Sequence, residues 1–148
     1  MAPEIANSWA LDWLWGLPLI VLTVLFHAAG LGFIDRQVTS ALGDARPLGE
    51  PSLTSIFTVG ATVLSVTILH ALECGIWAET YRILDAVPSN RSAMLYSLNA
   101  MTSYGHENLQ LASRWQMMGA MEALNGWILF GLTTAFLFTV MQKARSRS

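Results

Sequence analysis

Residues 99–108 read Asn-Ala-Met-Thr-Ser-Tyr-Gly-His-Glu-Asn, a polar stretch with one glycine inside an otherwise apolar sequence. A short amphipathic segment, residues 92–101, leads into it, and a long apolar run, residues 117–142, follows. Irregular backbone at membrane depth is tolerated only where it is buried in protein or lines a water-filled path. A short helix, a polar loop and a long apolar helix in this order therefore predict a re-entrant, ion-conducting loop.

The composition of the chain favours lipid as its surroundings. Hydrophobic residues make up 53% of the 148 residues and charged residues only 12%, against about 25% charged in typical soluble domains. The mean hydropathy is +0.46. A net charge of −2 gives no indication of nucleic-acid binding, and the single cysteine, Cys74, excludes an internal disulfide. The composition thus predicts an integral membrane protein.

Three apolar runs are long enough to cross a hydrocarbon core of about 30 Å, which takes about 20 residues. They are residues 13–34, 55–77 and 117–142. The segment 35–54 contains arginines and prolines and is predicted to be a loop in water. We therefore expect an all-α membrane protein with three transmembrane helices and one re-entrant helix.

We divide the chain into an N-terminal transmembrane helix with its cytoplasmic loop, residues 1–54, and a pore module, residues 55–148. The pore module is expected to contain an outer helix at 55–80, a pore helix at 92–101, a filter at 102–108 and an inner helix at 115–142.

The basic residues that flank the spans predict the orientation of the chain. Arg36 and Arg46 place the first loop inside, and the basic tail after residue 142 places the C-terminus on the same side. The N-terminus and the polar loop then lie outside. Five tryptophans near that outer boundary favour an aromatic belt there: Trp9, Trp13, Trp15, Trp77 and Trp115.

From His70 to Gln142 the chain resembles the bacterial two-helix-pore potassium channel family, with one extra span before the pore module. The resemblance lies in three segments: Ala93-Met94-Leu95-Tyr96-Ser97-Leu98, Leu124-Asn125-Gly126, and Phe130-Gly131-Leu132-Thr133-Thr134-Ala135. It implies a homotetramer in the bacterial plasma (inner) membrane, with its C-terminus in the cytoplasm. It also implies monovalent cations such as K⁺ as permeant ions, and no cofactor, metal, soluble substrate, nucleic acid or catalytic residue is expected.

The resemblance implies a selectivity filter at Thr102-Ser103-Tyr104-Gly105-His106-Glu107-Asn108. In this alignment Gly105 takes the first glycine of the family pattern T-T-x-G-Y-G-D, and the next three residues take its aromatic position, second glycine and aspartate. A second alignment pairs Tyr104-Gly105 with the Tyr-Gly of the pattern and stays open. Asn99 and Tyr96 are implied to support the filter from behind.

Glu107 in place of a glycine changes the expected chemistry of the filter. Carbonyls that point at a central axis require some positive φ angles, which glycine adopts freely, whereas another L-residue pays about 1–2 kcal/mol. We therefore expect a wider outer filter, where rings of Glu107 select cations without strict potassium selectivity. A collapsed, non-conducting filter is the alternative. One loop per chain requires a closed ring of copies.

Ionisable and small residues inside the spans suggest further roles. His70 and Glu73 share a helix face. They form either a proton-sensitive interhelical pair or hydrogen bonds to a neighbouring subunit or to the back of the pore helix, which would hold the tetramer together. The inner helix offers candidate hinge or gate residues: Glu122, Asn125, Gly126, Gly131 and Phe138. Glycines at these positions instead favour close helix packing.

Two other classes of protein remain open. A haem- or quinone-linked membrane anchor would use His27 and His70 as axial ligands, although alternating spans are expected to place them at different depths. A membrane metalloenzyme would use His70, Glu73 and Glu122, but H-x-x-E alone is a weak motif. Neither class explains the polar loop.

Overall fold

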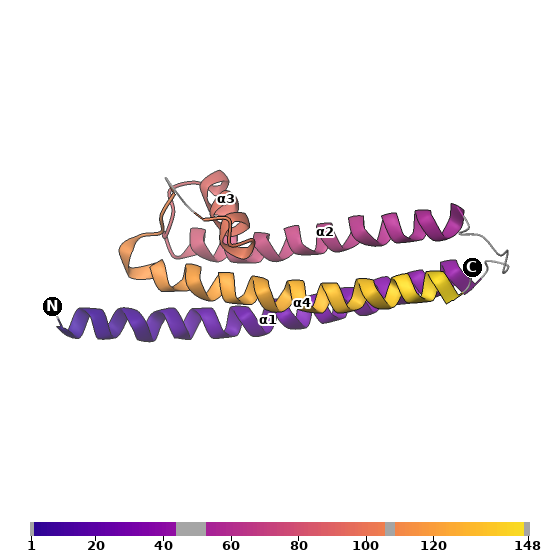
Figure 1. Ribbon diagram of the computed structural model, residues 1–148. Coiled ribbons are helices and arrows are strands. Elements are labelled where there is room, and N and C mark those ends of the chain that lie inside the picture. The colour runs from indigo at the N-terminus through magenta and orange to yellow at the C-terminus, as the bar shows by residue number, and fades with distance from the viewer. Residues whose placement is uncertain (1, 44–52, 106–108, 147–148) are drawn as a thin grey trace.

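The computed structural model describes residues 2–43, 53–105 and 109–146, and every regular element in these ranges is helical. The elements are α1 (Ala2–Gly43), α2 (Leu53–Ile83), α3 (Asn90–Met101), the 3₁₀ turn η1 (Ser113–Trp115) and α4 (Gln116–Ser146). Three long helices run alongside one another, and short α3 lies at the end where α2 stops and α4 starts (Figure 1).

Three helices are long and apolar enough to cross a membrane, which confirms the predicted number of spans. The candidate spans are Trp9–Ala41, Ser55–Ile83 and Ser113–Arg145. Many large apolar side chains on these helices are exposed in the single chain, as expected where lipid or another subunit replaces water. The chain is therefore organised as a multi-pass membrane protein.

The first helix is longer than predicted. The segment 35–54 was expected to be a loop, but α1 continues to Gly43. The extra turns pack on α4: Val38 is buried against Val140 and Ala144, and Lys143 Nζ lies 2.7 Å from Asp35 Oδ1. These contacts stabilise the continued helix. The hydropathy of a single segment does not reveal them, because they are made to a different part of the chain.

The short helix begins two residues before the predicted start. Ser89 is extended and its Oγ accepts a hydrogen bond from the backbone N–H of Ser92, at 3.1 Å, which is an N-cap. The helix buries Ala93, Tyr96, Ser97, Ala100 and Met101. These residues form one face, which packs against α2 and α4.

The C-terminal end of α3 lies well inside the bundle. Met101 Sδ is 3.5 Å from Cys74 Sγ, nine residues before the end of α2. The Met101 carbonyl also lies directly against Gly126, ten residues after the start of α4. At 1.5 Å per residue, both contacts lie about 14–15 Å from the end of the bundle.

The chain returns to that end before α4 begins. The N–H of Ala112 donates to the carbonyl of Ala86 at 2.9 Å, just beyond the end of α2. Among the described residues, α3 therefore runs into the bundle, and Ala112 lies back at the end of the bundle where α2 stops.

The expected aromatic belt is wrong for two of its five tryptophans. Trp77 and Trp115 are buried, with 0% and 6% of their surfaces exposed. They belong to the core cluster that also contains Tyr81, Tyr96 and Met118. Trp9, Trp13 and Trp15 on α1 are exposed. Hydropathy alone does not distinguish a tryptophan that faces lipid from one that packs between helices.

Candidate functional site

The described part of the predicted filter projects away from the core of its own chain. Thr102, Ser103, Tyr104 and Gly105 are all exposed, Tyr104 by 85%. The backbone is held to the end of α3, because the N–H of Tyr104 donates to the Asn99 carbonyl at 3.0 Å. The remaining predicted filter residues, His106, Glu107 and Asn108, lie outside the described residues.

In the described part of this loop, residues 102–105, two residues have left-handed backbone. Ser103 has φ of 54° and Gly105 has φ of 98°. Glycine adopts such angles without a steric penalty, so Gly105 is suited to its position. Asn99 is half-buried; its expected contact with Asn108 involves a residue outside the described ranges.

A buried polar network holds α3 from behind. Tyr81 on α2 donates its hydroxyl to Glu122 Oε2 on α4 at 2.7 Å. Ser97 on α3 bonds to Glu122 Oε1 and lies 2.8 Å from the carbonyl of Cys74. Glu122 and Ser97 are fully buried. One carboxyl group thus joins three helices at the level of α3.

Tyr96, the second predicted support residue, lies in the same region. It is 5% exposed and packs edge-to-face on Tyr81, with ring centroids 5.3 Å apart. Burial, and secondarily the negative charge of Glu122, raise the pKa of Tyr96 to about 12. Its hydroxyl lies directly over Gly119, where any larger residue would displace it. The buried Tyr96 ring therefore sets the distance between α3 and α4 at this point.

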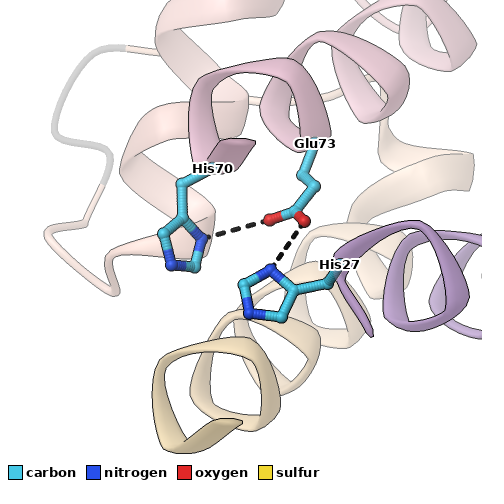
Figure 2. Close-up of side chains that lie close together, drawn as sticks. All are labelled: His27, His70 and Glu73. Atoms are coloured by element: carbon cyan, nitrogen blue, oxygen red, sulfur yellow. Dashed lines mark hydrogen bonds and ion pairs between the residues drawn. The ribbon is translucent and has the colours of Figure 1, made fainter. Parts of the chain in front are cut away.

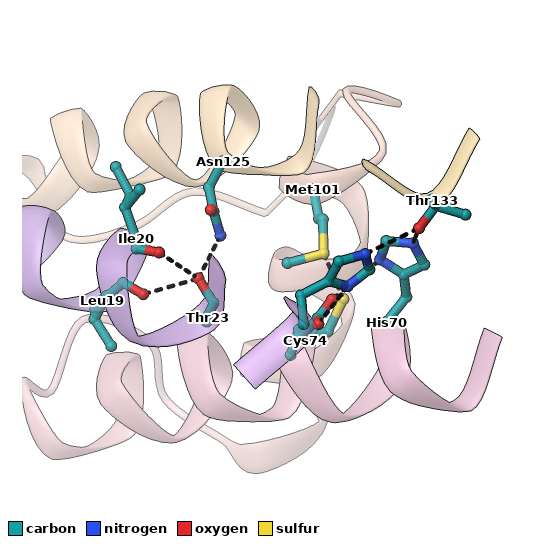
Figure 3. A network of polar contacts seen from close by, with 10 residues as sticks. Leu19, Ile20, Thr23, His70, Cys74, Met101, Asn125 and Thr133 are labelled. Carbon is teal, nitrogen blue, oxygen red and sulfur yellow. Dashed lines mark hydrogen bonds and ion pairs between the residues drawn. The ribbon is translucent and has the colours of Figure 1, made fainter. Parts of the chain in front are cut away.

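The candidate hinge and gate residues of α4 have different surroundings. Asn125 is fully buried and its Nδ2 donates to Thr23 Oγ1 on α1 at 2.8 Å (Figure 3). Gly126 is in close contact with the Met101 carbonyl, whereas a Cβ at Gly131 would meet nothing within 4 Å. Phe138 is 59% exposed. Asn125 and Gly126 therefore contact neighbouring helices within the chain, while Gly131 and Phe138 face outward.

A second polar cluster lies in the core between α1 and α2 (Figure 2). His27 Nδ1 is 2.8 Å from Glu73 Oε1, and His70 Nδ1 is 3.1 Å from Glu73 Oε2. His27 and Glu73 are fully buried, and His70 is 14% exposed. The expectation that the two histidines lie at different depths is wrong, since their ring centroids are 5.1 Å apart.

Thr133 on α4 closes this cluster from the opposite side. Its Oγ1 lies 3.0 Å from His70 Nε2 (Figure 3). The same oxygen lies 3.1 Å from His27 Nε2. Both imidazoles thus lie between a carboxylate on one side and a hydroxyl on the other. The cluster connects all three long helices.

The sequence pattern indicated only part of these two networks. It placed His70 with Glu73 and Glu122 with Asn125, and it paired His27 with His70 only as possible haem ligands. It did not indicate roles for Tyr81, Ser97, Thr23 and Thr133 in these networks. One signal was present: Thr23 and His27 are four residues apart and share a face of α1. Which face meets which partner depends on how each helix is rotated about its axis.

No protein-family model, no curated protein and no solved structure matches the chain. What the protein does is therefore argued from its residues and their geometry.

Proposed function

We propose that the chain is one subunit of a cation-conducting pore, in which four copies surround an axis lined by residues 102–108. The observation that carries the proposal is the path of the described residues 90–105. It descends about 14 Å into the bundle and ends in the exposed loop 102–105.

The depth of this descent matters because it is about half of a hydrocarbon core of about 30 Å. If the end of α2 lies at the membrane boundary, the loop after Met101 lies near the bilayer centre. Irregular backbone there needs protein or water around it, and its own chain leaves Thr102 to Gly105 exposed. Copies of the chain around a water-filled path supply both.

The orientation of α3 supports cations as the permeant species. Its C-terminal end points into the bundle, and no basic residue lies in its last turn. The C-terminal end of a helix carries a partial negative charge. Four such ends directed at one axis would stabilise a cation near the bilayer centre.

The buried network at Glu122 supports a rigid loop. A selective pore needs backbone groups at fixed positions, and Ser97 of α3 is bonded to Glu122 and to the α2 backbone. Tyr96 and Gly126 add close contacts on either side. These residues position the loop and do not line it.

The haem-linked anchor is less well supported by the geometry. Both ring nitrogens of His27 lie about a hydrogen-bond length from Glu73 or Thr133, and Thr133 also contacts His70. The two imidazoles therefore converge on small polar groups, and no porphyrin-sized gap separates them.

Arg36 near the C-terminal end of α1, and Lys143 and Arg145 in the last turn of α4, support a cytoplasmic C-terminus by the positive-inside rule. The inner membrane of a bacterium is proposed from the sequence resemblance alone. The loop then opens toward the outside. A cysteine accessibility assay in intact cells, with single cysteines at Ser148 and Ala2 in a Cys74→Ser background, tests this orientation. Labelling of position 148 from outside the cell would show that the proposed orientation is wrong.

The proposal is tested by ion flux in liposomes, comparing K⁺, Na⁺ and a larger organic cation. Gly105→Ala places a Cβ on backbone with φ of 98°, at about 1–2 kcal/mol per subunit, and is expected to reduce flux strongly. Gly60→Ala on α2, where a Cβ also meets nothing within 4 Å, is the matched control.

Two results would reject the proposal. Native mass spectrometry that finds only monomers and dimers would exclude a pore of four copies. Absence of flux for all three cations from a tetrameric sample would favour the non-conducting alternative.

A further inference from the structure

The His27–His70–Glu73 cluster contains an unusual contact between two buried atoms. His70 Nδ1 and Glu73 Oε2 lie 3.1 Å apart, yet neither has a hydrogen-bond partner among the described residues. Nearly all buried polar atoms in proteins have a partner. The contact therefore needs an explanation.

Counting hydrogen atoms shows why this contact is unsatisfied. With Glu73 ionised and both imidazoles neutral, the cluster has three polar hydrogens, one each on His27, His70 and Thr133. Three hydrogen bonds use them all: His27 to Glu73, Thr133 to His27, and His70 to Thr133. No hydrogen is then left for the fourth contact, so His70 Nδ1 and Glu73 Oε2 both lack a donor. A cation bound there, a proton or a metal ion, satisfies both atoms.

We propose that His27, His70 and Glu73 bind a divalent first-row transition-metal ion in the core of the bundle. One ligand atom from each residue lies within 4.8 Å of the other two. Two imidazoles and a carboxylate are a set found in zinc sites that keep a fourth position open. The same set binds non-haem iron(II).

The distances show how far the side chains have to rotate to bind an ion. Zinc bonds of about 2.0–2.2 Å in tetrahedral geometry separate the ligand atoms by about 3.3 Å. The two nitrogen–oxygen contacts are now 2.8 Å and 3.1 Å. These contacts are made to different oxygens of Glu73, and the three ligand atoms lie within 4.8 Å of one another. Binding through one oxygen therefore requires side-chain rotation that shortens the longest separation by up to about 1.5 Å.

Thr133 is placed to support the metal-bound form. With the ion on Nδ1 of both rings, the hydrogen of His27 moves to Nε2, and both Nε2–H groups donate to Thr133 Oγ1. A hydroxyl oxygen has two lone pairs and accepts both. Histidine ligands commonly donate their second nitrogen to such a partner, which fixes the ring.

Charge also favours the ion. Glu73 is fully buried, and an ionised carboxylate in an apolar core is costly unless it is paired or binds a metal. A divalent ion compensates that charge, and its fourth position takes water or an anion. Because the ligands come from α1 and α2 and their support from α4, the ion cross-links the three long helices.

The test uses the full chain in detergent, with purification tags removed and bound metal stripped by a chelator. Co²⁺ titration is expected to give a visible absorption band that saturates at one equivalent per chain. Zn²⁺ is expected to compete for the same site and to remain bound after desalting, as measured by mass spectrometry of the elements. The site lies within one chain, so its presence does not depend on the proposed pore.

Variants test the assigned residues. His70→Gln, at the least buried ligand, is expected to abolish the band, and Thr133→Val is expected to weaken binding about 10-fold, in line with other partners of histidine ligands. Asp12→Asn, at a buried carboxyl group outside the cluster, and Cys74→Ser are controls expected to bind like the unmodified chain.

A measurement on the unmodified chain tests the proposal even if the variants fail to fold. X-ray absorption of the zinc-loaded chain is expected to show two imidazole ligands and oxygen. Zinc should also raise the melting temperature of the unmodified chain but not that of His70→Gln. Stoichiometric binding that survives His70→Gln, loss of binding in Cys74→Ser, or no bound metal at all would each overturn the proposal.

Discussion

Gly126→Ala tests whether the end of α3 is held directly against α4. A Cβ at this position would lie 2.1 Å from the Met101 carbonyl oxygen, 2.9 Å from its carbon and 3.0 Å from its Cα. All three are backbone atoms, so no side-chain rotation relieves the clash. Ordinary contact begins near 3.4 Å, and the end of α3 therefore has to move by about 1.3 Å.

The energetic effect follows from two opposing terms. Overpacking of this kind costs about 1–3 kcal/mol, while replacing glycine by alanine in a helix gains about 1 kcal/mol. Gly131→Ala on the same helix gains the helix-propensity term without the overpacking cost, because its Cβ meets nothing within 4 Å. The two variants should therefore differ in free energy of unfolding by about 1–3 kcal/mol.

The assay compares the two variants by thermal melting in detergent and by cation flux in liposomes. At about 2–4 °C per kcal/mol for a chain of this size, Gly126→Ala should melt about 2–12 °C below Gly131→Ala. Because Thr102 directly follows Met101, flux should fall in Gly126→Ala as well. Equal melting and equal flux in the two variants would refute the close packing of α3 on α4.

Three further predictions address other contacts. Thr23→Val leaves the Asn125 amide without its 2.8 Å partner and should lower the free energy of unfolding by about 1–3 kcal/mol; adding Asn125→Leu should recover part of the loss in a double-mutant cycle. The pKa of the Tyr96 phenol is raised from 10.0 to about 12, so its contribution to stability is complete below pH 10 and is lost as the pH rises to 12. Between pH 9 and 11, the free energy of unfolding of Tyr96→Phe should therefore fall less than that of the unmodified chain. An equal fall in the two proteins would contradict this. Glu107→Gln should lower cation entry if Glu107 rings the outer mouth, whereas Glu79→Gln on α2 should leave liposome flux unchanged.

The main elements of the fold followed from local sequence. Runs of apolar residues long enough for a bilayer predicted three spanning helices, and the short segment ending at Met101 predicted a fourth helix that is too short to span. These features depend on the length and hydropathy of single segments. The helical turns between Asp35 and Gly43 were missed because their stability comes from packing on α4.

The sequence by itself determined which polar residues lie inside spans, and that His70 and Glu73 share one helix face. Only the tertiary structure decided that His27 joins them, that Thr133 contacts both imidazoles, and that Glu122 binds Tyr81 and Ser97. The physical reason is that a helix face is fixed by the 3.6-residue repeat within one segment. The rotation and axial position of one helix against another are fixed by side-chain packing across segments that are up to about a hundred residues apart.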